Sequence, residues 1–185
     1  MIYGMIAIAL MAVFYGAYFA KIIYLRRRNI KVNHLGRGKK DRVLLAKEIW
    51  LKFITFSIIA VQLFSLYYHG AGWPIAGLSI AGLGVAVFIA SLLSMKNSWR
   101  VGISAQEKTK LITAGVYRFS RNPAFVGFDL MYIGLWLAFP SGWHLIIAAL
   151  AIISLHFQIL EEERHLSNSM REEYQKYKNR TRRYI

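Results

Sequence analysis

The run PIAGLSIAGLGVAVFIASLLSM, which spans Pro74–Met95, contains 22 residues and none of them is charged. About 20 apolar residues in a helix cross the hydrocarbon core of a bilayer, where every backbone polar group must pair within the segment. Small residues recur along this run, and such residues let membrane helices approach closely: Gly77, Ala81, Gly82, Gly84, Ala86 and Ala90. The alternative, a glycine-rich cofactor loop, fits an apolar helix poorly. The run predicts a transmembrane helix that packs against a neighbour.

Four further apolar blocks flank this run, at about residues 2–25, 49–68, 124–139 and 145–160. The last two are shorter, and we expect either tilted spans or a hairpin that crosses a thinner region. The sequence therefore predicts an all-α integral membrane protein with about five transmembrane helices. We expect a single membrane domain over residues 1–185. It would comprise a three-helix part at 1–95 and, at 96–185, a motif region with a helical hairpin and an amphipathic tail.

The charge is strongly basic, with 24 Lys and Arg against 9 Asp and Glu and a formal net charge of +15. The cations cluster between apolar blocks, in segments 26–47 and 96–121 and in the tail, whereas turns 69–73 and 140–144 have none. Cytoplasmic loops of membrane proteins carry such an excess, so we interpret the charge as topological and expect no nucleic-acid partner. The N-terminus is predicted outside and the C-terminus in the cytoplasm. In a prokaryote the membrane would be the plasma or inner membrane.

Polar residues gather at the predicted cytoplasmic start of the fourth block. Pro123 suits the first turn of a helix, where its missing N–H costs nothing, and Asn122 would then be the N-cap. The helix start and Arg121 together favour an anionic group such as a ligand carboxylate. Gly115 allows a tight turn or close approach.

Three acidic residues, Glu161, Glu162 and Glu163, follow the fifth block. Neighbouring helix positions point about 100° apart, so all three cannot face one ligand. At least one is expected to be solvated or paired with a basic residue. Asp129, expected near the cytoplasmic interface, is either a partner for a nearby Arg or Lys or part of a site. By itself the tail 172–185 predicts an amphipathic helix on the membrane surface, with Tyr174 and Tyr177 at the interface.

The order and spacing of these residues resemble the isoprenylcysteine carboxyl methyltransferase family, which is itself similar to the integral membrane phospholipid methyltransferases. The matching residues occur in three groups: Gly115, Tyr117, Arg118, Arg121, Asn122, Pro123, Phe125 and Gly127, then Glu162, Glu163 and Leu166, then Glu173, Tyr174, Tyr177 and Arg183. The resemblance covers the chain from Ser98 to its C-terminus. The first three helices resemble the family only in length and topology.

The resemblance implies an S-adenosylmethionine-dependent methyltransferase. Its cofactor would occupy a cytoplasm-facing pocket formed by the C-terminal half, and a lipid-like or isoprenylated substrate would enter from the bilayer. By this resemblance Leu111, Gly115, Val116 and Tyr117 would lie near the adenosine. Arg121, Asn122 and Phe125 would flank the methionine part, within the motif that includes Pro123 and Gly127, while Glu162 and Glu163 would bind hydroxyl or amino groups. Arg121, Asn122 and Glu163 are the candidates nearest the chemistry, with the larger binding effect expected at Glu163.

Three positions depart from the family pattern. Asn122 replaces the commoner His and cannot titrate near neutral pH, which argues against a general base there. Phe125 replaces the commoner Tyr, and Gln158 stands where related carboxyl methyltransferases tend to have an Arg. Whether the methyl acceptor is a carboxylate is therefore left open.

Two other classes of protein stay open on the sequence. One is an NADPH-dependent, steroid-reductase-like membrane enzyme, and the other is a lipid-binding membrane protein without enzymatic activity. Because the chain has no cysteine and its five histidines lack a metal-binding spacing, we expect no metal site. The sequence does not define an oligomeric state.

Overall fold

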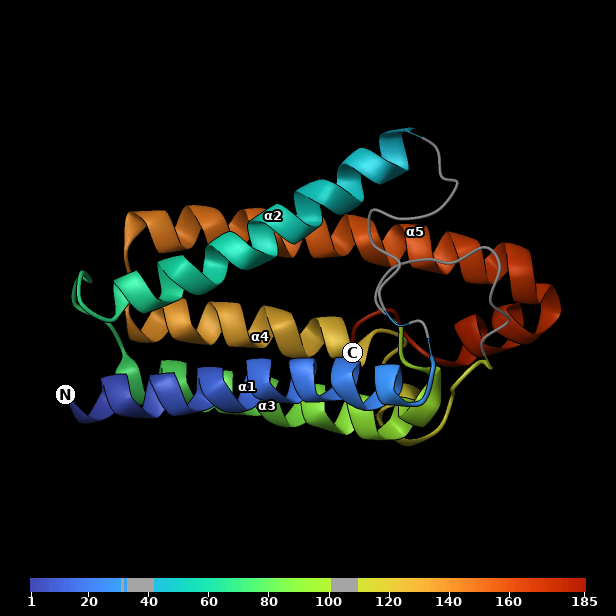
Figure 1. The fold of residues 1–185 in the computed structure, drawn as a ribbon, viewed down its shortest axis with the longest axis horizontal. Helices are drawn as coiled ribbons and strands as arrows, with labels where there is room; N and C mark the ends of the chain where they lie inside the picture. The colour runs from blue at the N-terminus through green and yellow to red at the C-terminus, as the bar shows by residue number, and fades with distance from the viewer. Residues whose placement is uncertain (31, 33–41, 101–109) are drawn as a thin grey trace.

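A computed structural model describes residues 1–30, 32, 42–100 and 110–185 of the chain. The described residues form five helices and no strand: α1 (Ile2–Arg27), α2 (Arg42–Ser65), α3 (Pro74–Met95), α4 (Pro123–Ala138) and α5 (Gly142–Arg180) (Figure 1). Two 3-10 turns, η1 (Lys96–Ser98) and η2 (Gly115–Arg118), lie between α3 and α4. The predicted all-α fold is confirmed.

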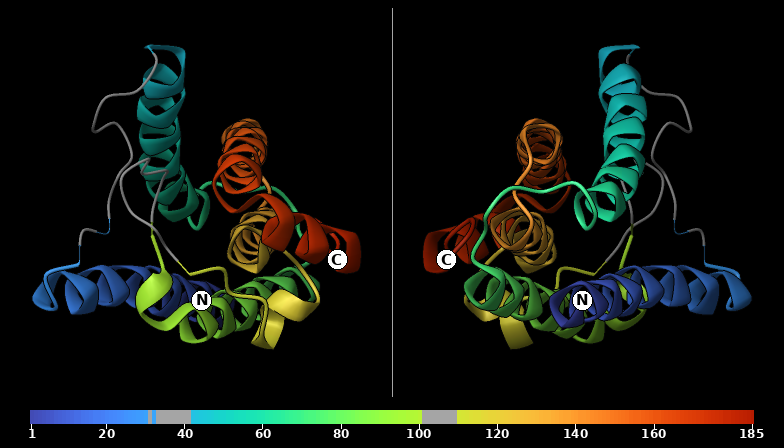
Figure 2. Two further views of the ribbon diagram at one scale, coloured as in Figure 1. Left: turned by 90° about the vertical axis from the view of Figure 1, so that its right-hand side faces the viewer. Right: turned by 90° about the vertical axis from the view of Figure 1, so that its left-hand side faces the viewer.

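Successive helices run in alternating directions, so the same type of helix end gathers at each end of the bundle (Figure 1). α1 and α3 form one layer, α4 lies over α3, and α2 and α5 lie on the other side of α4 (Figure 2). The end of α1, the starts of α2 and α4 and the end of α3 lie together. We call this the basic end, because the clusters of Lys and Arg fall there. The two predicted basic loops lie partly outside the described residues, at 31, 33–41 and 101–109.

Helix length and composition match a membrane protein. α1, α3 with its 3-10 extension to Ser98, and α5 are long and apolar enough to cross a bilayer, and α4 is a shorter apolar helix. α2 begins at Arg42, whereas the sequence predicted a start at about residue 49. The first half of the helix carries Lys47, Glu48 and Lys52. Glu48 is fully buried, so the face of α2 that carries it packs against protein, whereas the neighbouring Ile49 and Trp50 are exposed.

Glycines bring α3 and α4 into close contact, as the small residues of 74–95 predicted. A Cβ atom added at Gly77 would lie 2.4 Å from the backbone nitrogen of Ala138 and 2.5 Å from the carbonyl oxygen of Gly134. At Gly134 it would lie 2.4 Å from the backbone nitrogen of Ala81. No side chain fits at these two crossings, so the two helix backbones pack directly on each other.

The C-terminal part of α5 folds back along the bundle. The helix continues beyond residue 160 as far as Arg180, with non-helical dihedral angles at Arg171 (φ 31°, ψ −103°). As Figure 1 shows, the chain then returns to end beside the start of α4. The prediction that Tyr174 and Tyr177 lie at the membrane interface is wrong, because only 1% and 3% of these residues are exposed. They pack against the polypeptide because the bend turns them inward.

Candidate functional site

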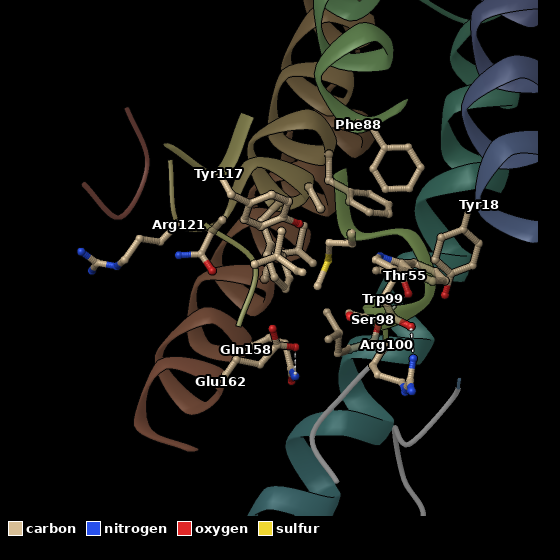
Figure 3. A pocket seen from close by; sticks show the side chains of 18 of the residues that line it. Tyr18, Thr55, Phe88, Ser98, Trp99, Arg100, Tyr117, Arg121, Gln158 and Glu162 are labelled. Atoms are coloured by element: carbon tan, nitrogen blue, oxygen red, sulfur yellow. Dashed lines mark hydrogen bonds between the residues drawn. The ribbon is translucent and has the colours of Figure 1, made fainter. Parts of the chain in front are cut away.

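A cavity of about 230 Å³ lies between the layers at the basic end of the bundle. All five helices contribute to its wall. One end is lined by polar residues from the segment before α4 and from α5, and the other mainly by apolar and aromatic residues of α1, α2 and α3, with Ser98 and Arg100 beside them (Figure 3). Figure 3 shows Glu162 and Gln158 on one wall, with Arg100 and Trp99 on the opposite wall.

The polar end is built around Glu162. Its side chain lines the cavity and accepts a hydrogen bond of 2.9 Å at Oε1 from Nε2 of Gln158, one turn earlier on α5. Tyr117 lines the same end. Burial raises the pKa of Tyr117 above its usual value, and the nearby Glu162 carboxylate raises it further. Tyr117 is therefore a neutral hydroxyl beside an acidic group.

Glu163, the next residue, is directed into a different environment. Its Oε1 lies 2.9 Å from Nη2 and 3.0 Å from Nε of Arg121, and its Oε2 lies 3.0 Å from Nη2 and 3.1 Å from Nε of Arg183. The side chains of Arg121 and Glu163 are only 7% and 8% exposed. The hydrogen bond to Glu163 raises the pKa of Arg183 above its usual value. Both carboxylate oxygens are therefore engaged by guanidinium groups of the protein itself.

Residues 181–185, which we call the C-terminal strap, are tied to the segment before α4. The backbone N–H of Arg121 donates to the carbonyl of Arg182 at 2.9 Å, next to a parallel bridge between Ser120 and Arg182. Nη1 of Arg121 donates to the carbonyl of Thr181 at 2.6 Å. The strap therefore closes over the start of α4, held by backbone pairing and by the Arg121–Glu163–Arg183 ion pairs.

Two further contacts fix the wall of the cavity. The hydroxyl of Tyr177 donates to the carbonyl of Tyr117 at 2.6 Å, which joins the returning part of α5 to η2. Gly115 has a φ of +65°, and a Cβ there would lie 2.4 Å from Oγ of Ser94. The close approach predicted at Gly115 is thus confirmed, and it brings η2 against α3.

Most of the predicted site residues lie close together at the basic end, but only some of them line the cavity. Those that line the cavity are Leu111, Tyr117, Arg121, Asn122, Phe125 and Glu162. The others are not among the lining residues: Gly115, Val116, Pro123, Gly127 and Glu163. A Cβ at Gly127 would lie 2.8 Å from Cβ of Phe88, so this glycine serves the packing of α4 on α3.

Asn122 stands at the N-cap position of α4, and Pro123 occupies the first turn as predicted. The side chain of Asn122 does not cap the helix. Instead its Nδ2 donates to Oε1 of Glu163 and to the carbonyl of Arg183, each at 3.2 Å. The anionic group expected near Arg121 and the helix start is therefore present in the protein as the Glu163 carboxylate.

The apolar end of the cavity comes from residues that the sequence motif does not cover. They lie on the first three helices and directly after η1: Tyr15, Tyr18, Phe19, Thr55, Phe56, Ile59, Phe88 and Trp99. Aromatic residues in a transmembrane helix are ordinary, so only the spacing of Tyr15, Tyr18 and Phe19 on one helix face was available as a signal. Asp129 does not line the cavity, and its buried Oδ1 has no hydrogen-bond partner among the described residues.

The fold and the cavity define an all-helical membrane protein with a polar site that opens into an apolar chamber. Residues 73–173, more than half of the chain, match the model of the phospholipid methyltransferase family. The protein belongs to this family. The match takes in α3 and α4 and most of α5, and it confirms the resemblance to integral membrane methyltransferases.

One curated relative is the nickel-cobalt-cadmium resistance protein NccN of Alcaligenes xylosoxydans xylosoxydans, which is 26% identical over 125 residues. The aligned region covers 67% of this chain and 59% of that protein, so the chain spans less than two thirds of its relative's length. No solved structure matches the chain.

Proposed function

We propose that the protein is an S-adenosylmethionine-dependent membrane methyltransferase whose acceptor is a lipid-like or isoprenylated molecule. The observation that carries this proposal is one continuous cavity whose polar end is built by the family motif and whose other end is mainly apolar. Membership of the phospholipid methyltransferase family supports the reaction class. The division of the cavity supports one polar and one lipophilic ligand side by side.

The polar end fits the proposed cofactor. The Glu162 carboxylate can accept hydrogen bonds from ribose hydroxyls or from an ammonium group, and such charge-assisted bonds are strong. Phe125 and Tyr174 also line the cavity and supply aromatic surface, which suits a base or a cationic sulfur centre. When bound, S-adenosylmethionine supplies a methyl group on a sulfonium, and its displacement needs alignment and exclusion of water more than a strong acid or base.

Within this proposal the two neighbouring acids have different tasks. Glu162 contacts the cofactor, because it faces the cavity and keeps an unshared oxygen beyond its bond to Gln158. Glu163 acts through Arg121 and Arg183, since it holds the strap closed and keeps Asn122 oriented. We therefore propose that replacing Glu162 lowers cofactor affinity more directly than replacing Glu163, although the sequence led us to expect the larger effect at Glu163.

The apolar end supports a lipophilic acceptor. α1 and α2 both line the cavity and pack little on each other, so we infer that a lipophilic acceptor enters from the bilayer between them. Gln158 is neutral and is bonded to Glu162. An acceptor carboxylate would therefore meet a lining cation elsewhere, namely Lys110. Arg121 is already paired with Glu163.

Two further aspects belong to the proposal. The basic end is assigned to the cytoplasm, in keeping with the excess of Lys and Arg. No metal is included, although the relative named above is a metal resistance protein. Among the residues that the structure describes, no group of three or more His, Asp or Glu side chains is arranged to hold a metal ion.

Thermal unfolding of the purified protein in detergent distinguishes the candidate functions. S-adenosylmethionine and its demethylated product should each stabilise the fold, because a ligand at 100 times its Kd adds about 2.7 kcal/mol. Stabilisation by NADPH alone would replace the proposal with the steroid-reductase-like enzyme. Stabilisation by none of the three would favour a lipid-binding protein without this activity.

A further inference from the structure

A second concave surface lies between α1 and α3, on the side of α1 that faces away from the cavity. This groove has a volume of about 620 Å³ and shares no lining residue with the cavity. Successive helix positions are rotated by about 100°, which turns Ala17, Ala20 and Tyr24 away from Tyr15 on α1. The groove is therefore separate from the proposed active site, and its ligand goes beyond the proposed function.

Three cations surround the mouth of the groove: Lys21, Arg28 and Lys96. The ring of Tyr24 forms cation–π contacts with two of them, since its centroid lies 5.8 Å from Nζ of Lys21 and 4.7 Å from Cζ of Arg28. Nζ of Lys21 donates to the carbonyl of Leu92 at 2.9 Å, which draws it toward the last turn of α3. Among the described residues no carboxylate forms an ion pair with these three cations.

The floor of the groove is apolar and faces outward. Ala17, Ala20, Ile89 and Leu93 line it, and Leu93 is 69% exposed. Both helices that form the groove are long and apolar enough to span a bilayer. This floor therefore lies at the depth of lipid chains, while the cations lie near the helix ends, at the depth of headgroups. A small soluble anion would contact the cations and leave the floor uncovered.

We propose that this groove binds one anionic phospholipid, with its phosphate between Lys21, Arg28 and Lys96 and an acyl chain along the floor. Charge complementarity selects the headgroup, because basic pockets between transmembrane helices attract anionic lipids. The small side chains of Ala17 and Ala20 leave room for the chain on α1.

Native mass spectrometry of the full chain in non-ionic detergent tests the proposal, with phosphatidylglycerol and phosphatidylcholine of the same acyl chains as probes. One phosphatidylglycerol should be retained in preference to phosphatidylcholine. Each basic residue beside an anionic lipid changes affinity about fivefold. Lys21→Gln, Arg28→Gln and Lys96→Gln together should thus weaken retention on the order of a hundredfold. A matched control, Lys176→Gln, Lys178→Gln and Arg180→Gln, removes three cations from α5 and should leave retention unchanged.

A second variant tests the floor without any change in charge. Ala20 is exposed on α1, so Ala20→Trp fills the groove without disturbing the core, and it should also abolish selective retention. This variant decides the question if the triple variant does not fold. Equal retention in wild type and Ala20→Trp, or equal losses in the triple variant and its control, would overturn the proposal. So would displacement of the lipid by inorganic phosphate, which would identify a general anion site.

Discussion

The two ends of the cavity are held together by different interactions. At the polar end, side chains and backbone are tied by charged hydrogen bonds, above all those between Glu163 and the guanidinium groups of Arg121 and Arg183. At the apolar end the wall consists of aromatic packing, such as the rings of Phe88 and Phe128 at 5.1 Å. A polar end with fixed geometry suits a ligand of constant shape. An apolar end without directional bonds accepts a lipophilic ligand without defining it in detail.

The largest expected effect comes from breaking the ion pairs of the polar end. Glu163→Gln leaves the buried guanidinium of Arg121 without its counter-charge, and removal of one partner from a buried pair costs about 3–5 kcal/mol. Denaturant unfolding in detergent measures this loss. Glu161→Gln is the matched control, because Glu161 pairs with the more exposed Lys47 and Arg164 and should lose about 1 kcal/mol at most. Equal losses in the two variants would contradict a structural role for Glu163.

The apolar end should respond to a change in shape and leave the polar end unaffected. Thr55 lines the cavity on α2, and Thr55→Phe should lower methyl incorporation into a membrane lipid extract about tenfold, since overfilled sites cost about 1–3 kcal/mol. Affinity for S-adenosylhomocysteine should stay within about twofold, well below the effect of one lost hydrogen bond. Ser57→Phe, on the same helix but not lining the cavity, is the control. Similar activity in both variants would remove α2 from the acceptor site.

A smaller effect is expected at the junction of the two parts of the chain that form the polar end. Tyr177→Phe removes only the hydroxyl that donates to the carbonyl of Tyr117. A neutral hydrogen bond contributes about 1 kcal/mol net, so the melting temperature should fall by a few degrees. Tyr184→Phe, within the C-terminal strap, removes the contact with His156 and serves as a comparison. An unchanged melting temperature in Tyr177→Phe would show that η2 does not depend on this bond.

The least perturbing test concerns the side of the membrane on which the polar end lies. The chain has no cysteine, so single cysteines report accessibility directly. Lys178→Cys should resist an impermeant thiol reagent in intact cells, whereas Gly70→Cys at the opposite end of the bundle should react. Gly72 is unsuitable, because a Cβ there would lie 2.5 Å from Cδ of Pro140. Labelling at position 178 from outside would reverse the proposed orientation.

Local features of the sequence predicted much of the fold. The apolar blocks predicted the helices, the small residues of 74–95 predicted the close α3–α4 contact, and Pro123 predicted the start of α4. These features depend on helix geometry and on the thickness of a bilayer, which act over neighbouring residues. The motif likewise brought together Arg121, Asn122 and the acidic pair.

The features that the sequence did not predict depend on long-range packing. Residues 162 and 163 are adjacent in the chain, and which of them faces the cavity depends on how α5 is rotated against α4. From the sequence alone the tail resembled a surface helix. The bend at Arg171, which turns one face of the tail inward, is not predicted by the local sequence. The apolar end combines α1, α2 and α3 with the motif region, and beyond the spacing of Tyr15, Tyr18 and Phe19 the sequence contains no local signal for such a combination.

Calorimetric titration with S-adenosylhomocysteine, the demethylated product of the proposed cofactor, tests the central claim most directly. Wild type and the control Glu161→Gln should bind alike. Glu162→Gln keeps the size of the side chain but weakens charge-assisted hydrogen bonds that contribute about 1.5–3 kcal/mol, so its affinity should fall on the order of tenfold to a hundredfold. Its stability without ligand should stay close to that of wild type. Wild-type affinity in Glu162→Gln, or no binding to the wild-type protein, would contradict a cofactor site at the polar end of the cavity.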